Sequence, residues 1–432
     1  MTVTFVGHGY VGLVTAAVFA DLGNTVWVVG RTKEKIDNLK KGIAPFYEPG
    51  LAELVKRNVE AGRLIFTLDY KAAVGPSSII FICVGTPPKG TGEADLTSVF
   101  AAAESIAKSL VGYKVVVTKS TVPPGTNQKV AEVLTKYKPA GASFAIASVP
   151  EFLREGTAIA DTLHPDRVIV GTTSDRAREL LLELHQPIDG KVVTCNVETA
   201  ELIKYASNSL LSTKISFANS IAFLSEKVGA DAETVLEGVG LDRRLGRNFL
   251  YPGVGYGGSC FPKDVKALIA IADHYGYDFS ILRAVDDVNK EAKKNFVEKI
   301  LKHFNGDVKN KTLAVLGLSF KPDTDDMREA PSIGIITELV HNGAKVVAYD
   351  PVAMEKAKPV LPAKVLYAQN PYDAANNADG VVVLTEWNEF RQLDLVKLAK
   401  GLKSLVMFDG RNLYEPTRVK QLGFMYYGVG RM

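Results

Sequence analysis

Short apolar runs alternate with longer amphipathic stretches through the first 195 residues of the chain. The runs end at glycine, proline or polar loops, and they span residues 2–6, 26–29, 78–84, 114–118, 143–147 and 168–171. Apolar runs of this length predict strands, and the stretches between them predict helices. Strands that alternate with helices form a parallel sheet covered by helices. The pattern therefore predicts an α/β fold, with ligand-binding loops at the carboxyl ends of the strands.

Residues 198–228 break this alternation with one long helical stretch, ETAELIKYASNSLLSTKISFANSIAFLSEKV. The stretch contains neither proline nor glycine and is apolar around much of its circumference. A helix of that kind must be buried, either between domains or against a second subunit. We therefore expect a homodimer, or a higher oligomer, formed through this helix.

A second α/β unit begins near Lys311. Its signals are TLAVLGLSF as a strand and turn, a helix at 332–342, and the strand AKVVAYDP, which carries Asp350 at its end. This unit lacks a GxGxxG motif, so we expect a Rossmann-like domain that holds a different nucleotide. The predicted architecture is α/β, with two Rossmann-like domains joined by a long central helix. The expected domains are a dinucleotide-binding domain at 1–194, a helical dimerisation domain at 195–302 and the second Rossmann-like domain at 303–432.

Composition narrows the classes of partner. The chain has 432 residues and a formal net charge of +3, with no basic block interleaved with aromatic residues, so nucleic acid is not an expected partner. No apolar run approaches the ~18 residues of a membrane span. The three cysteines, Cys83, Cys195 and Cys260, suit a reducing compartment, and the N-terminal stretch lacks the basic region of a signal peptide. We expect a cytoplasmic protein without a membrane partner and, in the absence of a CxxC or Cys/His cluster, without a metal.

The N-terminal strand is followed directly by a glycine motif, Gly7-His8-Gly9-Tyr10-Val11-Gly12, and then by a helix. In this context the first glycine makes the tight turn, the second lets a pyrophosphate approach the backbone, and the third packs helix on strand. The amides of the helix N-terminus then face the phosphates. The motif predicts a bound dinucleotide.

The end of the second strand departs from the usual pattern of dinucleotide-binding domains. An acid there normally accepts hydrogen bonds from the adenosine ribose, but this chain has Gly30 followed by Arg31. Arg31, with Thr32 and Lys33 beside it, is suited to gripping a 2′-phosphate, which favours NADP. The alternative is that Arg31 stacks on adenine and that NAD binds without the usual carboxylate. Both cofactors remain open at this point.

The stretch GVGYGGSCFPKD, residues 253–264, places one cysteine between a glycine-rich loop and a helix. The glycines permit a substrate to approach closely, and a thiol near a helix N-terminus is more readily ionised. Lys263 and Asp264 follow within one turn. Cys260 is therefore the candidate nucleophile, whereas Cys83 and Cys195 lie in apolar strand contexts typical of structural thiols.

The motifs together resemble the UDP-glucose/GDP-mannose dehydrogenase family over nearly the whole chain. They are GHGYVGL, VGTPP, KSTVPPGT, PEFLREGTAI, ELIKYASNSLLSTKISFAN, GGSCFPKD and GLSFKPDTDDMREAPS, in the family's order. The resemblance implies oxidation of the C6 alcohol of a nucleotide sugar to a carboxylate in two hydride transfers. GYGGSCFPKD is closer to the UDP-glucose branch than to the GDP-mannose branch, and EFLREG argues against the N-acetylmannosamine branch. The implied reaction is that of UDP-glucose to UDP-glucuronate with NAD, and residues 303–432 become a UDP-sugar-binding domain.

The resemblance also implies roles for single residues. Cys260 would form a thiohemiacetal and then a thioester at C6. Lys204 and Asn208, which stand i,i+4 on the central helix, would stabilise the oxygen on that carbon. Asp264 would hold Lys204 and a water and is a candidate base. Glu151 would activate the hydrolytic water, positioned with the help of Thr121.

Ligand-binding residues are carried over in the same way. The cofactor would contact Gly7, Gly9, Tyr10, Val11, Gly12, Gly30, Arg31, Lys35, Val84, Gly85, Thr86, Thr121, Glu155, Lys263 and Arg328. The nucleotide sugar would contact Glu151, Phe152, Leu153, Arg154, Lys204, Asn208, Arg244, Phe249, Leu250, Tyr251, Gly255, Gly257, Phe261 and Lys321, with Arg244 reaching the substrate of a partner subunit.

The sequence departs from the family pattern at two positions, and two other functions remain as alternatives. The family usually has an acid at the place of Gly30, and an Asn at the place of Val149, so we expect weaker anchoring of the Glu151 loop. A GDP-mannose or other nucleotide-sugar 6-dehydrogenase is the nearer alternative, and a 6-phosphogluconate or β-hydroxyacid dehydrogenase is the more distant one. The latter class needs no cysteine and has no second Rossmann unit. A non-catalytic nucleotide-sugar-binding protein would not need Cys260, Lys204, Asn208 and Asp264 together.

Overall fold

The computed structural model describes residues 1–431, which divide into two compact units, Met1–Ser207 and the chain from Asn208 onward. The first unit contains an eight-stranded sheet in the order β3-β2-β1-β4-β5-β6-β7-β8. All neighbours are parallel except β6 and β7. The strands are β1 (Thr2–Val6), β2 (Thr25–Val29), β3 (Leu64–Thr67), β4 (Ile79–Ile82), β5 (Tyr113–Thr118), β6 (Ser143–Ser148), β7 (Arg167–Gly171) and β8 (Lys191–Cys195).

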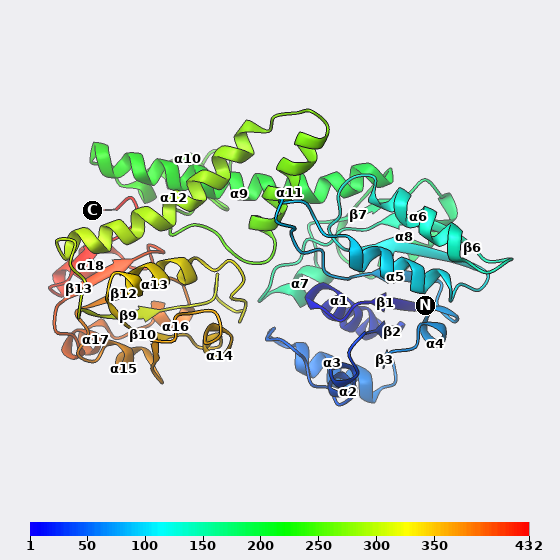
Figure 1. The fold of residues 1–432 in the computed structure, drawn as a ribbon, viewed down its shortest axis with the longest axis horizontal. Helices are drawn as coiled ribbons and strands as arrows, with labels where there is room; N and C mark the ends of the chain where they lie inside the picture. Colours follow the sequence, from blue (N-terminus) through cyan, green and yellow to red (C-terminus); the bar gives the residue numbers. More distant parts are fainter. Residues whose placement is uncertain (432) are drawn as a thin grey trace. The chain divides into compact units, whose positions relative to one another are not determined.

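Helices cover both faces of this sheet (Figure 1). They are α1 (Tyr10–Asp21), α2 (Lys33–Lys40), α3 (Leu51–Glu60), α4 (Tyr70–Val74), α5 (Thr97–Ala107), α6 (Thr126–Tyr137), α7 (Ala158–Leu163) and α8 (Asp175–His185). Along β4, Ile79 and Phe81 belong to the core under α1 and α8, whereas Ile80 and Ile82 belong to the core under α5 and α6. Burial on both faces explains why the strand is a continuous apolar run.

The long helix α9 (Val197–Val228) continues from the first unit into the second, which confirms the predicted central helix. It is followed by α10 (Ala232–Gly240), α11 (Phe261–His274) and α12 (Ser280–His303). Then comes a six-stranded parallel sheet in the order β11-β10-β9-β12-β13-β14. Its strands are β9 (Thr312–Leu316), β10 (Lys345–Tyr349), β11 (Leu366–Tyr367), β12 (Gly380–Val383), β13 (Val406–Asp409) and β14 (Met425–Tyr427).

This second sheet also has helices on both faces. They are α13 (Pro331–His341), α14 (Met354–Ala357), α15 (Pro371–Ala375), α16 (Asn388–Arg391), α17 (Leu395–Gly401) and α18 (Pro416–Gln421). Leu313 and Val315 of β9 face one core, and Ala314 and Leu316 face the other. The α/β class and the two Rossmann-like sheets predicted from the sequence are therefore confirmed.

Asp350 lies at the end of β10, where a dinucleotide-binding domain has its ribose-binding acid. Here its carboxylate binds other segments of the second unit. Its carboxylate is fully buried and accepts hydrogen bonds from the backbone amides of Leu318 (2.7 Å) and Ala353 (2.8 Å). The indole of Trp387 donates to it as well (3.1 Å). These donors come from three separate segments. The Asp350 carboxylate therefore links the loops at this end of the second sheet.

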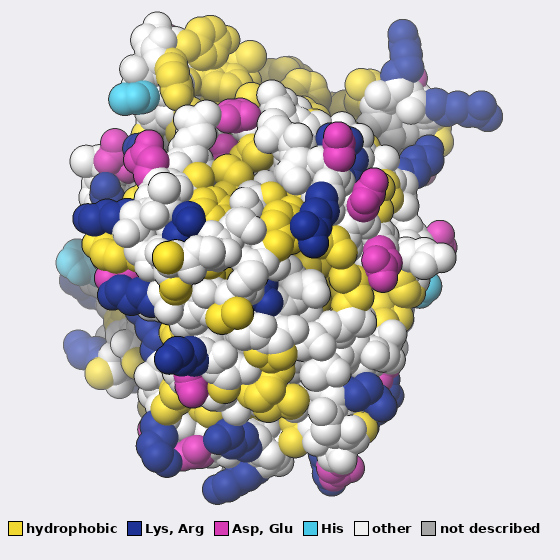
Figure 2. Space-filling view, turned by 90° about the vertical axis from the view of Figure 1, so that its right-hand side faces the viewer, with side chains coloured by type: hydrophobic (Ala, Val, Ile, Leu, Met, Phe, Trp, Pro, Cys, Tyr) yellow, Lys and Arg dark blue, Asp and Glu magenta, His cyan; other side chains and the backbone are white. Residues whose placement is uncertain are grey.

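Charges of both signs are distributed over the surface. Figure 2 shows lysine and arginine side chains interspersed with acidic and apolar ones on one face of the molecule. Within residues 1–431, none of the helices combines the length and the apolar character that crossing a membrane requires.

Candidate active site

The glycine loop after β1 has the geometry that a dinucleotide requires. Gly7 has a φ of 113°, and a Cβ there would lie 2.5 Å from the carbonyl oxygen of Cys83. A Cβ at Gly12 would lie 2.2 Å from the carbonyl oxygen of Gly7, so both positions require glycine. Gly9 is the N-cap of α1, and a Cβ built there would meet nothing within 4 Å among the described residues. The open helix N-terminus fits a pyrophosphate.

The end of β2 carries no acidic side chain, and two neighbouring side chains pack against Gly30. A Cβ at Gly30 would lie 2.6 Å from the His8 ring and 2.6 Å from Cδ1 of Ile36. Arg31 and Lys35 are exposed beside this position. Burial lowers the pKa of His8, and the charges of Lys35 and Arg31 lower it further. An imidazole and two cations therefore lie near Gly30, where dinucleotide-binding domains usually have a carboxylate.

The loops after β4 and β5, which the resemblance assigns to the cofactor, are bonded to each other. Thr86 Oγ1 donates to the carbonyl oxygen of Thr121 (3.0 Å), and Ser120 Oγ donates to that of Val84 (2.7 Å). Gly85 lies between these contacts in the chain. The hydrogen bonds give the predicted cofactor residues a common support at the carboxyl end of the sheet.

Glu48 is a buried acid that sequence reasoning missed. It accepts hydrogen bonds from the amides of Gly156 (2.6 Å) and Ala158 (2.8 Å), and from the hydroxyl of Tyr10. Burial raises the pKa of the Tyr10 hydroxyl, and the hydrogen bond with the Glu48 carboxylate raises it further. Glu48 thus ties the glycine-loop helix to the segment that follows Glu155.

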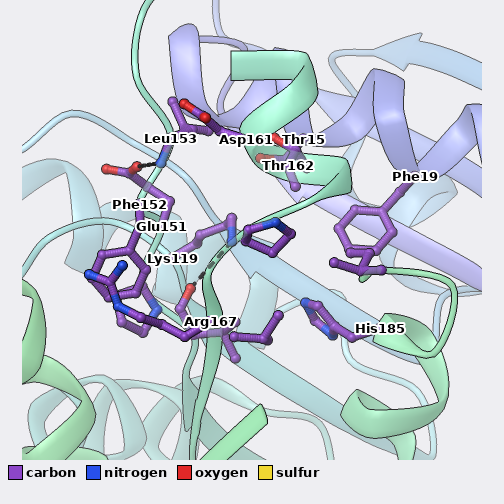
Figure 3. A pocket seen from close by; sticks show the side chains of 15 residues that line it. Thr15, Phe19, Lys119, Glu151, Phe152, Leu153, Asp161, Thr162, Arg167 and His185 are labelled. Atoms are coloured by element: carbon purple, nitrogen blue, oxygen red, sulfur yellow. Dashed lines mark hydrogen bonds between the residues drawn. The ribbon is translucent and has the colours of Figure 1, made fainter. Parts of the chain in front are cut away.

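Glu151 and Lys204 form a buried ion pair within the first unit. The Lys204 Nζ lies 3.0 Å from Glu151 Oε1, and the two side chains are 4% and 8% exposed, respectively. Glu151 Oε2 accepts a hydrogen bond from the Leu153 amide (2.9 Å), as Figure 3 shows. The ring of Phe152 lies 5.2 Å from the Lys204 ammonium and 3.9 Å from the guanidinium of Arg167. The structure brings together these two predicted site residues, which are 53 positions apart in the sequence.

The second unit presents Cys260 at the N-terminus of α11. Cys260 forms the N-cap, which confirms the predicted position just before a helix. It is exposed, and Pro262 lies in the first turn. Its Sγ lies 3.6 Å from Ser259 Oγ. By contrast, Cys83 is buried, and burial raises the pKa of its thiol to about 12; Cys195 is half-buried at the end of β8.

The carboxylate of Asp264, one turn beyond Cys260, is almost completely buried. It accepts a hydrogen bond from Asn208 Nδ2 (2.6 Å) and forms an ion pair with Lys263. Asn208 stands one helical turn after Lys204 on α9. Asp264, Asn208 and Lys263, three of the residues implied by the resemblance, are thus connected at the start of α11.

The glycine-rich loop before Cys260 is held from several sides. A Cβ at Gly255, whose φ is 91°, would lie 2.6 Å from Asn289 Oδ1, and a Cβ at Gly257 would lie 2.3 Å from the carbonyl oxygen of Glu329. Arg411, which sequence reasoning missed, donates to the carbonyl oxygens of Gly255 (3.1 Å) and Leu384 (2.9 Å). The loop is therefore fixed to the second sheet.

The remaining predicted substrate residues are placed as follows. Phe249 has a positive φ of 66°, and its ring lies 6.2 Å from that of Phe261. The guanidinium of Arg247 lies 4.6 Å from the ring of Tyr251. The basic side chains assigned to ligands have partners within their own units: Arg154 with Asp161 (2.6 Å), Arg244 with Asp242 (2.6 Å) and Arg328 with Asp326 (2.7 Å), and Lys321 lies 5.7 Å from the Phe320 ring.

Most of the sequence matches one family. Residues 1–189 match the NAD binding domain of the UDP-glucose/GDP-mannose dehydrogenase family, residues 198–291 its central domain and residues 314–416 its UDP binding domain. The chain belongs to this family. A relative, UDP-glucose 6-dehydrogenase TuaD of Bacillus subtilis, is 48% identical over 429 residues, which cover 99% of this chain and 93% of the relative. The UDP-glucose 6-dehydrogenase of Rhizobium meliloti is 46% identical over 437 residues, covering all of both chains.

Solved structures of the family are similar over the full chain. A UDP-glucose dehydrogenase from the hyperthermophilic archaeon Pyrobaculum islandicum has a TM-score of 0.92 and 38% identity, covering 100% of this chain and 98% of that one. A UDP-D-ManNAc dehydrogenase from Pyrococcus horikoshii has a TM-score of 0.87 and 28% identity, covering 100% and 99%. The UDP binding domain matched at 314–416 does not agree with the more distant alternative, a 6-phosphogluconate or β-hydroxyacid dehydrogenase.

Proposed function

We propose that the chain oxidises UDP-glucose at C6 to UDP-glucuronate, with release of the carboxylate only after two oxidations. The exposed Cys260 at the start of α11 carries this proposal, because a four-electron oxidation at one carbon needs a nucleophile that holds the aldehyde. The names of relatives that are 48% and 46% identical support the same substrate. Three cysteines are too few for a disulfide framework, which supports a reducing compartment such as the cytoplasm.

Different residues of the chain have different roles in the two oxidation steps. The cofactor, when bound, supplies a hydride acceptor for each of the two steps. Asp264 is the candidate base for the C6 hydroxyl proton, and Cys260 Sγ adds to the resulting aldehyde to give a thiohemiacetal. Lys204 and Asn208, one turn apart on α9, stabilise negative charge on the C6 oxygen. If the thiolate adds, the adduct is a negatively charged thiohemiacetal, and loss of the second hydride from it to a bound cofactor would give the thioester.

Hydrolysis of the thioester completes the reaction. Glu151 takes a proton from water, which Thr121 helps to position, and the hydroxide adds to C6. Collapse of the tetrahedral adduct expels the Cys260 thiolate and leaves UDP-glucuronate. The burial of the Glu151 carboxylate supports this role, because a base shielded from bulk solvent acts on a water held at a fixed place.

The experiment that tests the proposed reaction counts reduced cofactor per sugar. The purified protein is incubated with limiting UDP-glucose and excess NAD or NADP, and the product is separated by anion exchange. Two reduced cofactors per sugar, with UDP-glucuronate as the product, is the expected result. One reduced cofactor with an aldehyde product would contradict the thioester route. A faster reaction with GDP-mannose than with UDP-glucose would show instead that GDP-mannose is the substrate.

We further infer that the site accepts NADP beside NAD. The domain matched at 1–189 is an NAD binding domain, and the glycine loop fits the pyrophosphate of either cofactor. Gly30 supports NADP, because it lacks the carboxylate that would repel a 2′-phosphate. Arg31 and Lys35 supply positive charge at the same corner.

Replacement of Arg31 by Asp tests the NADP inference. We expect kcat/KM for NADP to fall about tenfold to hundredfold, because a charge-assisted hydrogen bond to the 2′-phosphate is replaced by repulsion. The value for NAD should change much less. The matched control is Lys41→Asp, which makes the same change of charge at the exposed end of α2. Unchanged NADP kinetics in Arg31→Asp would show that another group reads the phosphate.

We propose that two chains associate through α9. Leu210, Phe217 and Leu224 are 63%, 50% and 55% exposed and are spaced by seven residues, so they form one apolar stripe. The buried face of the same helix carries small polar side chains, for example Ser216, whose hydroxyl donates to the carbonyl oxygen of Val285 (2.9 Å). A helix that exposes its large apolar residues and buries its small ones fits a partner helix.

The variant Phe217→Lys is expected to shift the molar mass measured by light scattering from that of a dimer toward that of a monomer. A charge in the middle of the stripe would be desolvated in the interface, which costs several kcal/mol. Val111→Lys, at a similarly exposed apolar residue before β5, is the control and should leave the mass unchanged. A Phe217→Lys protein that keeps its mass would place the interface elsewhere.

A further inference from the structure

Asn289 of α12 is a buried polar side chain to which the proposed reaction gives no role. It lies within the second unit and is 4% exposed. Burying an amide group costs free energy unless its donors and its acceptor are hydrogen-bonded, so the partners of this side chain show what it stabilises. Those partners belong to the glycine-rich loop that precedes Cys260.

Asn289 binds both backbone polar groups of one residue in that loop. The amide of Tyr256 donates to Asn289 Oδ1 (2.8 Å), and Asn289 Nδ2 donates to the carbonyl oxygen of Tyr256 (3.1 Å). Because two bonds on opposite sides of one residue fix its orientation as well as its position, the loop cannot pivot there. Tyr256 stands between Gly255 and Gly257, both of which the resemblance assigns to the nucleotide sugar.

Other contacts hold the two ends of the loop. At its start, the amide of Gly253 donates to Asn219 Oδ1 (2.8 Å). At its end, the amide of Gly258 donates to the carbonyl oxygen of Arg328 (2.9 Å). Neither bond reaches Tyr256, so the position of the middle of the loop depends on Asn289.

The side chain of Tyr256 connects this part of the loop to the start of α11. It is buried, and its ring meets that of Phe261 edge to face, with 5.9 Å between the ring centroids. Phe261 is the first residue of α11 and directly follows Cys260. A shift of Tyr256 would therefore affect both the glycines assigned to the sugar and the candidate nucleophile.

We propose that Asn289 is a positioning residue for the substrate loop: by holding the backbone of Tyr256, it fixes the shape of the loop that binds UDP-glucose next to Cys260. The inference rests on the proposed function, because the contact between this loop and UDP-glucose is part of that proposal. It assigns Asn289 no contact with the sugar.

The test compares Asn289→Leu and Asn289→Ser with the parent protein in steady-state kinetics. Leucine is similar in size but loses both hydrogen bonds, and serine is too short to reach Tyr256. We expect KM for UDP-glucose to rise about tenfold in Asn289→Leu and at least about threefold in Asn289→Ser. A purely structural defect would instead lower the apparent kcat through a loss of active molecules and leave KM unchanged.

A second measurement follows binding without turnover. UDP-glucose bound beside Cys260 should protect this thiol from iodoacetamide, and mass spectrometry of the Cys260 peptide gives the concentration for half-protection. In both variants this concentration should rise by the same factor as KM. The Kd of NADH, measured by its fluorescence, should stay unchanged, because the NAD binding domain matched at 1–189 contains neither Asn289 nor Tyr256.

The matched control is Asn295→Leu on the same helix. Asn295 Nδ2 donates to Glu291 Oε1 (3.3 Å), within α12 itself. Its replacement should leave KM for UDP-glucose, the protection of Cys260 and the Kd of NADH unchanged. If Asn289→Leu does not fold, as judged by circular dichroism, Asn289→Ser carries the measurement.

The failure of this inference differs from the failure of the proposed function. An unchanged KM for UDP-glucose in a folded Asn289 variant overturns the inference. An equal loss of affinity for NADH and for UDP-glucose also overturns it, because Asn289 would then stabilise the protein as a whole. If UDP-glucose neither protects Cys260 nor is oxidised in the parent protein, the proposed function itself is wrong.

Discussion

The variant Cys260→Ser is expected to form UDP-glucuronate about a thousandfold more slowly than the parent protein, or not at all. A serine hydroxyl is a far weaker nucleophile than a thiol at neutral pH, so the aldehyde is not held as a covalent adduct. Without that adduct the second hydride transfer and the hydrolysis have no substrate. The measurement is the number of cofactors reduced per UDP-glucose, together with the yield of acid over several turnovers.

Two variants control for this result. Cys195→Ser changes the half-buried thiol at the end of β8 and should still give two reduced cofactors per sugar. Ser259→Ala removes the hydroxyl that lies 3.6 Å from Cys260 Sγ and separates the thiol's own chemistry from that of its neighbour. Acid formation at the parent rate in Cys260→Ser would exclude the thioester route.

The main elements of the fold could be predicted from the sequence because the central strands of both sheets are buried on two faces. The strand predicted at 2–6 matches β1, and the helix predicted at 198–228 begins one residue late relative to α9. β3 and β8 were missed for two reasons. β3 has four residues with alternating burial, and β8 is an edge strand whose first four residues are exposed, so neither is a continuous buried run. The strand predicted at 78–84 is longer than β4, because the chain leaves the sheet before Val84.

Part of the site could be predicted in the same way. Glycines at tight turns and a cysteine before a helix are local signals, and the structure places Gly7 and Cys260 accordingly. Contacts between distant segments have no such signal. Lys119 and Glu48 are buried only because loops separated by 30 to 110 positions meet at them. Arg411 binds a loop 156 positions away, and no periodicity in the sequence indicates that contact.

The second prediction with a large expected effect concerns the buried ion pair of Lys204 and Glu151. We expect Lys204→Met to lower kcat by about a hundredfold to a thousandfold, since it removes a group that stabilises charge on the C6 oxygen. The same variant should lower the stability of the first unit by about 3 kcal/mol, because it leaves a carboxylate that is 8% exposed without its ion-pair partner. Steady-state kinetics gives the first quantity. Hydrogen exchange of the β5 and β6 amides gives the second.

The double variant Lys204→Met/Glu151→Leu separates the structural effect from the catalytic one. Replacing both members of a buried ion pair by apolar side chains is often neutral for stability, so protection of β5 and β6 should return toward that of the parent protein. Turnover should remain low, because neither the charge at the C6 oxygen nor the base for water is restored. If turnover recovers with stability, Lys204 acts only through the fold. If protection is unchanged in the single variant, the ion pair contributes little to the first unit, and the low exposure of both side chains has another cause.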